Sequence, residues 1–179
     1  FTISDPQAGY LPLNAVDSGF VPPNNVNTGS TTALPSLPSK PGMIINATDP
    51  TYGGGEFMLL LGVSGTAVGT VVTYNAVTYL TTLVSATPGA PQPVAVAMSA
   101  NAAATTWGWY QISGVAVATK SAVTAVSGGA VGVTTAGLVG IPATTVQVLQ
   151  GAVYAAGATT LNTTVPIMIN RPHTDDVWL

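Results

Sequence analysis

Side chains able to support acid–base or metal chemistry are scarce in this chain, and they cluster at one place. His173, Asp175 and Asp176 follow Pro172. An imidazole beside carboxylates is what a metal site or a Ser-His-Asp arrangement needs. A charged tail, solvated or at an interface, explains the same residues with no further assumption. Because acid–base catalysis needs titratable groups held in a cleft, we predict no catalytic residue, no metal ligand, no cofactor and no enzymatic activity.

The glycines at positions 53–55 are a second candidate, for a phosphate-binding loop. No lysine follows them, and no strand–loop–helix pattern surrounds them. We therefore interpret them as a flexible hinge. Glu56, which comes next, is the only acid in residues 50–170. Its simplest role is a charge at a strand edge that resists unwanted pairing, and Arg171 and Lys120 are its candidate ion-pair partners.

The aromatic side chains are densest at Trp107, Trp109 and Tyr110. Successive residues of a strand point to opposite faces, so Trp107 and Trp109 share one face, while Tyr110 shares the other with Ile112. The first interpretation is a core strand that contributes large rings. The second is a surface on which a ligand such as a sugar stacks.

Charge is unusually sparse over the whole chain. Three basic and six acidic residues among 179 make 5% charged residues, and the mean hydropathy is +0.48, whereas an ordinary globular domain is about a quarter charged. A surface of this kind is wetted by Thr, Ser, Asn and backbone groups, or it is covered by partners. This composition predicts a component of an assembly.

The same inventory excludes several partners. The basic residues Lys40, Lys120 and Arg171 lie far apart, and phosphate backbones bind clustered basic residues, so we predict no nucleic acid. The most apolar stretch, residues 57–72, is interrupted by glycines and is shorter than the roughly 20 residues that span a bilayer, so we predict no membrane. The absence of cysteine excludes disulfides and thiolate metal sites.

Residues 1–50 differ in composition from the rest. They hold eight of the fourteen prolines, separated by Asn, Gly, Ser and Thr, which disfavours helices and central strands. A disordered tail is one interpretation. Hydrophobic residues at intervals favour another, an extended arm that lies on a surface of its own chain or of a neighbour. The anchors we predict on this arm are Leu11, Leu13, Phe20, Val21, Leu34 and Leu37.

Residues 51–179 show apolar runs about ten residues apart with turn residues between them, which is typical of all-β domains. The runs are Glu56–Val63, Thr70–Tyr74, Val77–Val84, Pro93–Met98, Trp107–Ile112, Val115–Thr119, Ala130–Thr135, Val146–Tyr154 and Thr164–Asn170. Residues 99–106 are the one candidate for a helical turn. We therefore predict an antiparallel β-sandwich or β-barrel domain, preceded by an extended Pro-rich arm.

Some runs alternate clearly. Val94 and Val96 point to one face and Ala95 to the other, so this run is apolar on both faces, as in sheets covered on both sides. Ile167 alternates with Met168, so the last strand either is half-buried or meets a second surface.

An ordered set of segments resembles the capsid decoration, or cement, proteins of tailed bacteriophages. The segments are Tyr52 to Phe57, Gly69 to Tyr74, Pro93 to Ala97, Gly108 to Ala116 and Ile169 to Pro172. The resemblance covers residues 50–173 and leaves the Pro-rich arm outside. It implies a small β-sandwich or β-barrel on the outer face of an icosahedral shell, commonly a trimer, and no catalytic residues.

We therefore expect a virion structural protein on the outer capsid surface. Its expected partners are the major capsid protein and itself, as a homotrimer. It would stabilise contacts between major capsid proteins, with the arm as a second tethered contact. Two alternatives stay open: a receptor- or glycan-binding domain of a head fibre or spike, and a subunit of a bacterial adhesin or surface layer.

Overall fold

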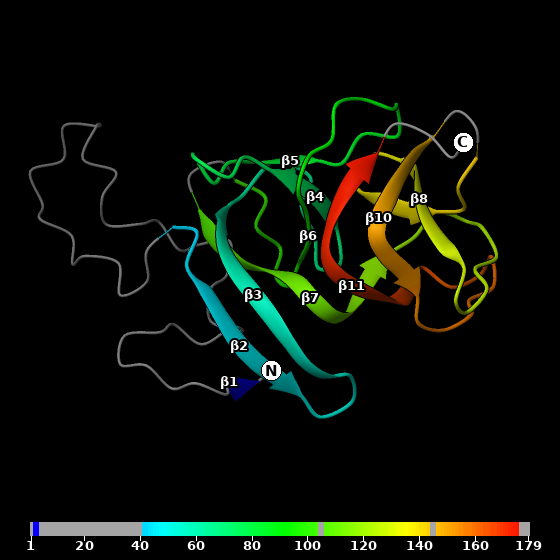
Figure 1. The fold of residues 1–179 in the computed structure, drawn as a ribbon, viewed down its shortest axis with the longest axis horizontal. Coiled ribbons are helices and arrows are strands. Elements are labelled where there is room, and N and C mark those ends of the chain that lie inside the picture. Colours follow the sequence, from blue (N-terminus) through cyan, green and yellow to red (C-terminus); the bar gives the residue numbers. More distant parts are fainter. Residues whose placement is uncertain (1, 4–40, 104–105, 144–145, 176–179) are drawn as a thin grey trace, which may run out of the picture.

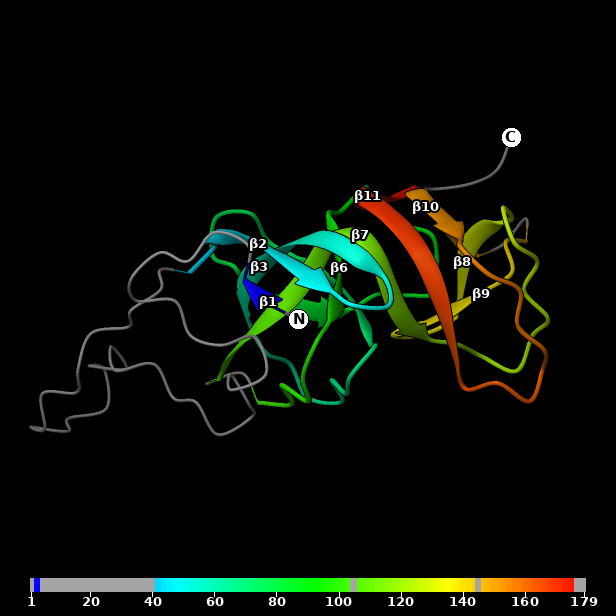
Figure 2. The same ribbon diagram turned by 90° about the horizontal axis from the view of Figure 1, so that it is seen from below.

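The computed structural model describes residues 2–3, 41–103, 106–143 and 146–175. The six predicted arm anchors lie outside these residues. Every described element is a strand, and every pairing between strands is antiparallel. The chain is all-β, and its sheet curls into a half-barrel (Figures 1 and 2). The predicted antiparallel all-β fold class is confirmed for the described residues, whereas residues 4–40 of the predicted extended arm lie outside them.

The strands are β1 (Thr2–Ile3), β2 (Ile44–Asp49), β3 (Gly53–Leu61), β4 (Val71–Tyr74), β5 (Thr81–Leu83), β6 (Val94–Ala97), β7 (Trp107–Thr119), β8 (Ala130–Thr135), β9 (Leu138–Gly140), β10 (Gln147–Tyr154) and β11 (Thr164–Asp175). They pair in the order β1-β2-β3-β7-β11-β10-β8-β9. β6 also pairs with β7, β4 pairs with β6, and β5 pairs with β4.

Strand β7 changes partner half-way along and so divides the sheet into two parts. Trp107 to Gly114 pair with β3, and Ser113 to Thr119 pair with β11. We call β2, β3 and the first half of β7 the wing. The second half of β7 with β8–β11 is the barrel. The wing and the barrel lie side by side in Figure 2.

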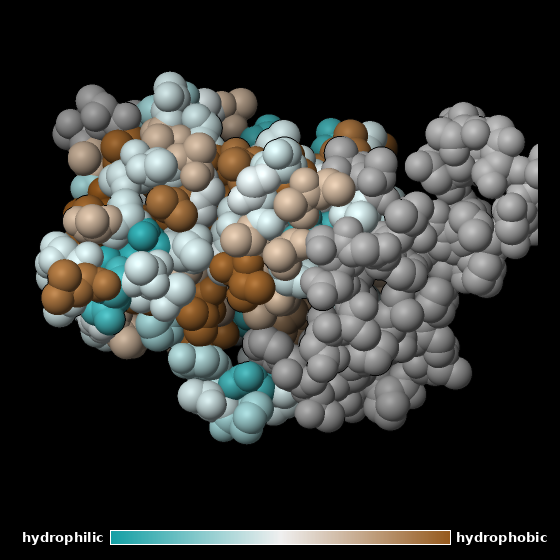
Figure 3. All heavy atoms as spheres, turned by 180° about the vertical axis from the view of Figure 1, so that it is seen from behind, coloured by the Kyte–Doolittle hydropathy of each residue, from teal (hydrophilic) through white to brown (hydrophobic). Residues whose placement is uncertain are grey.

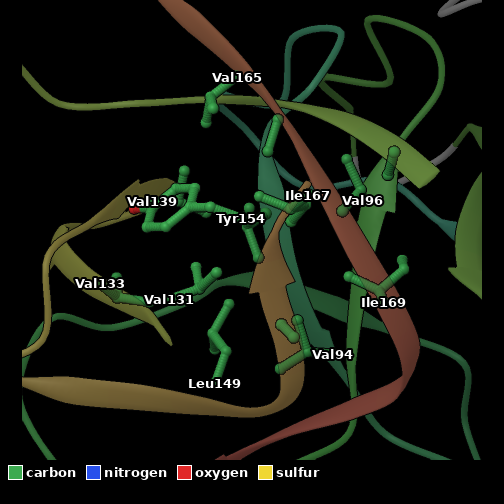
Figure 4. Packing of buried hydrophobic residues seen from close by; sticks show 14 of the residues in the cluster. Val94, Val96, Val131, Val133, Val139, Leu149, Tyr154, Val165, Ile167 and Ile169 are labelled. Carbon is green, nitrogen blue, oxygen red and sulfur yellow. The ribbon is translucent and has the colours of Figure 1, made fainter. Parts of the chain in front are cut away.

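The barrel encloses the largest core. Its inward side chains are mainly Val, Ile, Leu and Ala from β7 to β11, and residues of β4 and β6, together with Val84 and Ala125 from loops, also belong to the cluster. Figure 4 shows these residues pointing toward one another. The one large polar-tipped member is Tyr154, whose hydroxyl donates to the Gly140 carbonyl over 2.8 Å. Burial raises the pKa of Tyr154 to about 12.

The wing has buried residues on both faces. Phe57, Leu59 and Trp109 form one cluster together with Ile45 and Ala47. The opposite face carries Met58, Leu60, Tyr110 and Ile112, which pack on Val72, Ala95 and Ala97 of β4 and β6. The alternation predicted around the tryptophans is therefore confirmed.

Strand β6 is buried on both faces by its own chain. Val94 and Val96 belong to the barrel core, while Ala95 and Ala97 belong to the core of the wing. Its apolar character on both faces is thus explained without a neighbouring subunit.

The interpretation of residues 53–55 as a hinge is wrong. All three glycines belong to β3 and pair with β2, which begins at Ile44 inside the segment predicted as the arm. Ile45 and Ala47 of β2 point inward, whereas Asn46 and Thr48 are exposed. This alternation is present in the sequence, but it is only six residues long and follows a run of prolines.

The turn that joins β2 to β3 is closed by Asp49. One carboxylate oxygen, Oδ1, accepts hydrogen bonds from the backbone N–H of Thr51 over 2.7 Å and of Tyr52 over 2.9 Å. These bonds, that of Tyr52 first, lower the pKa of Asp49. The only carboxylate of β2 is therefore engaged in its own turn.

Further features of the structure differ from the sequence prediction. The runs at Trp107–Ile112 and Val115–Thr119 form one strand, because Gly114 continues β7 with a φ of 96°. The short strand β9 was not predicted. Residues 99–106 show no helix at the positions that the structure describes.

Candidate interaction surface

The candidate cluster of His173, Asp175 and Asp176 lies only partly within the described residues. His173 pairs in register with Gln150, and Asp175 pairs with Val148, so both are ladder positions of β11. Asp176 lies outside the described residues. No group of three or more His, Cys, Asp or Glu residues that could hold a metal ion occurs in the part of the chain that the structure describes.

Glu56 is paired with Arg171, one of its two candidate partners. Arg171 Nη2 donates to Glu56 Oε1 over 3.1 Å, and Nε donates to Oε2 over 3.3 Å. This bond raises the pKa of the guanidinium. The Arg171 side chain is 59% exposed, and an ion pair exposed in this way is screened by solvent and contributes little to stability. The edge-charge interpretation of Glu56 is wrong, because β3 pairs with β2 on one side and with β7 on the other.

Lys120, the other candidate partner, is buried beside the barrel. Its Nζ donates to the carbonyls of Ser121 over 3.0 Å and of Val123 over 2.7 Å. These bonds give the buried ammonium group backbone oxygens as partners.

The aromatic cluster divides between two cores. Trp109 and Tyr110 are both fully buried, on opposite faces of the wing, and Trp107 is half-buried at the margin of the Trp109 cluster. The Tyr110 hydroxyl lies 3.1 Å from the side-chain amide of Asn101, and burial raises the pKa of Tyr110. The ring of Trp109 has no face in contact with solvent on which a sugar could stack.

The outer surface of the described part is nearly uncharged. Its charged residues are Asp49, Glu56, Lys120, Arg171 and Asp175, of which Lys120 is buried and Glu56 and Arg171 neutralise each other. Figure 3 shows hydrophobic side chains in several groups on the back of the molecule, among mostly pale, weakly polar ones.

Apolar side chains cross three strands of the barrel on its outer face. Met168 of β11 lies opposite Val115 of β7 on one side and opposite Val153 of β10 on the other. Pro166 and Val117 form the next cross-strand pair on the same face. Met168 is 52% exposed and Val153 is 41% exposed. We call these five residues the outer strip.

A shallow hollow adjoins the outer strip where β8 and β10 part. Their register shifts between Leu149 and Val153, and Gly151 has a φ of 75° in the bulge. The hollow is lined by Gly128, Ala130, Val148, Leu149, Gln150, Gly151, Ala152, Val153, Met168, Ile169 and Asn170. Because none of these residues is ionisable, the hollow suits an uncharged side chain of a partner and no acid–base chemistry.

Sequence reasoning found one member of the outer strip. Alternation with Ile167 indicated that Met168 meets a second surface or solvent. Val115 and Val153 were not identified, because the register that places them beside Met168 joins positions that are far apart in the sequence.

No protein-family model, no curated protein and no solved structure matches this chain. Among the described residues, no helix is both long and apolar enough to cross a membrane.

Proposed function

We propose that this chain is a structural protein of a phage virion, which binds the outer surface of an icosahedral capsid and stabilises contacts between major capsid proteins. The observation that carries the proposal is the outer strip, an apolar row with Met168 and Val153 exposed and its other members half-buried, on a surface almost free of charge. Contiguous exposed apolar surface marks interaction sites in soluble proteins. The resemblance to decoration proteins supports the same function.

In the mechanism that we propose, two individually weak contacts act together to hold the chain on the capsid. The outer strip supplies a small apolar interface, and residues 1–40 supply a second, tethered contact through the anchors Leu11, Leu13, Phe20, Val21, Leu34 and Leu37. Tethering makes the second contact effectively intramolecular, which raises the overall affinity by about 100-fold or more when both contacts can form together. Homotrimers of this chain would multiply both contacts.

The glycan-binding alternative receives no support from the described surface. It depended on a pair of tryptophans with exposed rings, and Trp109 is fully buried.

Met168→Glu is expected to weaken binding to the capsid by about ten- to one-hundred-fold. A fully buried apolar side chain of this size contributes about 1.5–3 kcal/mol, and about 1.4 kcal/mol corresponds to a tenfold change in dissociation constant. The measurement is co-sedimentation with expanded capsids assembled from the major capsid protein of the phage that would encode this chain. Leu161→Glu is the matched control, because Leu161 is 91% exposed in the turn before β11.

Equal retention of the Met168→Glu and Leu161→Glu chains on capsids would exclude the outer strip as the contact. Absence of any binding by the unmodified chain would contradict the function itself.

Deletion of residues 1–40 is expected to leave a folded domain that leaves capsids upon heating or dilution. The deletion stops before β2, so it removes β1 and the predicted anchors and keeps the rest of the sheet. The tethered contact is lost, so retention is expected to fall by about 100-fold. Co-sedimentation measures retention, and circular dichroism checks the fold. Undiminished retention of the shortened chain would exclude the tether.

A further inference from the structure

The free edge of the wing carries a very short strand. β1 pairs with β2 at Thr2↔Thr48 and Ile3↔Ala47. On its other side, β2 pairs with β3 at all its positions from Ile44 to Asp49. Within the described residues, β1 thus pairs with only Ala47 and Thr48 of the six residues of β2.

The chain between the paired segments is long. Residues 4–43, about forty positions, separate Ile3 from β2, whereas adjacent strands lie about 4.8 Å apart. Among the described residues, β1 is joined to the sheet at two paired positions, and the entropic cost of bringing two segments of one chain together grows with the number of residues between them. Nothing in the register requires that β1 and β2 belong to the same chain, since an identical β1 from another copy presents the same backbone groups.

The sequence of β2 also has few of the residues that prevent another strand from pairing with its edge. Edge strands are commonly protected by lysine, proline or inward-pointing charge. β2 reads Ile-Ile-Asn-Ala-Thr-Asp and has none of them except Asp49, whose carboxylate is held in the turn. On the strand that would be added, Pro6 limits the length because it has no N–H to donate. The added strand is therefore short, and one copy of it can readily be replaced by another.

We propose that copies of this chain exchange β1, so that Thr2–Ile3 of one copy pairs with Ala47–Thr48 of a second copy. The occupant of the β2 edge is thus the same segment of another chain. Exchange of an identical element replaces bonds within a chain by the same bonds between chains, and the added strand binds through its main chain. The core residues Ile45 and Ala47 on β2 connect this link to the buried cluster of the wing. The proposal does not depend on capsid binding.

The absence of cysteine from the chain allows a direct test. Thr2→Cys is made in one full-length chain, and Thr48→Cys is made in another that carries a mass tag. Cross-strand Cα atoms in antiparallel pairs lie about 4.5–5.5 Å apart, within the span of a disulfide. Thr48 is exposed, so its replacement leaves the core unchanged. After mixing and mild oxidation, the expected product is a reducible band at the summed mass of the two chains.

Thr160→Cys in place of Thr48→Cys is the control, because Thr160 is exposed in the turn between β10 and β11. Its mixture with the Thr2→Cys chain is expected to give no such band above background. The pair Ile3→Cys and Ala47→Cys repeats the test at the next register position.

Two outcomes would overturn the exchange. The first is a double variant, Thr2→Cys with Thr48→Cys in one chain, that closes only within itself while the mixture stays uncoupled. The second is the absence of a cross-link in every arrangement at both register positions, which would show that β1 does not pair with β2. Both readouts use the protein alone, so they are independent of whether the chain binds a capsid.

Discussion

Trp109→Ala is expected to lower the free energy of unfolding by about 3–5 kcal/mol, the range for truncating a fully buried large aromatic side chain. Trp109 is fully buried, lies opposite Leu59 in the β3–β7 register, and belongs to the wing cluster with Phe57 and Ile45. Stabilities of single domains are commonly about 5–15 kcal/mol. Chemical denaturation followed by circular dichroism measures the loss.

Trp107→Ala is the matched control for this prediction. Trp107 lies on the same face of β7, but it is only half-buried at the margin of the same cluster. We expect a clearly smaller loss of stability, because less apolar area leaves solvent contact when the domain folds. If the Trp109→Ala chain were as stable as the unmodified chain and had lost binding to a sugar, the stacking interpretation would be correct instead.

The parts of the fold that could be predicted are those that depend on local patterns. Alternation along Pro93–Met98 and around Trp109 is a property of consecutive residues, and the structure has β6 and β7 there with the expected faces. Turn residues between apolar runs likewise predicted β8, whose bounds are Ala130–Thr135.

The parts that could not be predicted depend on pairing between distant residues. Whether residues 53–55 form a hinge or a strand is decided by β2, which supplies the partner positions. The outer strip exists because three strands align Val115, Met168 and Val153, and no single run of sequence contains this alignment. The surface that carries the proposed function therefore depends on the register in which β7, β11 and β10 pair.

Gly114→Ala is expected to destabilise the domain by about 3 kcal/mol or more, through two additive causes. Gly114 has a φ of 96°, which costs an L-residue roughly 1–2 kcal/mol. An added Cβ would also collide with the Gly54 carbonyl oxygen and lie 2.9 Å from the Gly55 Cα, both of which are backbone atoms of β3. Overpacking of this kind typically costs about 1–3 kcal/mol. Thermal and chemical denaturation measure the sum.

Gly54→Ala separates the crowding from a general effect of adding a methyl group. Gly54 lies on the facing strand, and an added Cβ there would meet nothing within 4 Å, so we expect a change within about 0.5 kcal/mol. Gly114 marks the place where β7 leaves β3 and takes β11 as its partner. Crowding at this point would therefore disturb the register of the outer strip, which begins at the next residue, Val115. Equal stability of the two variants would contradict the close approach of β3 and β7 at Gly114.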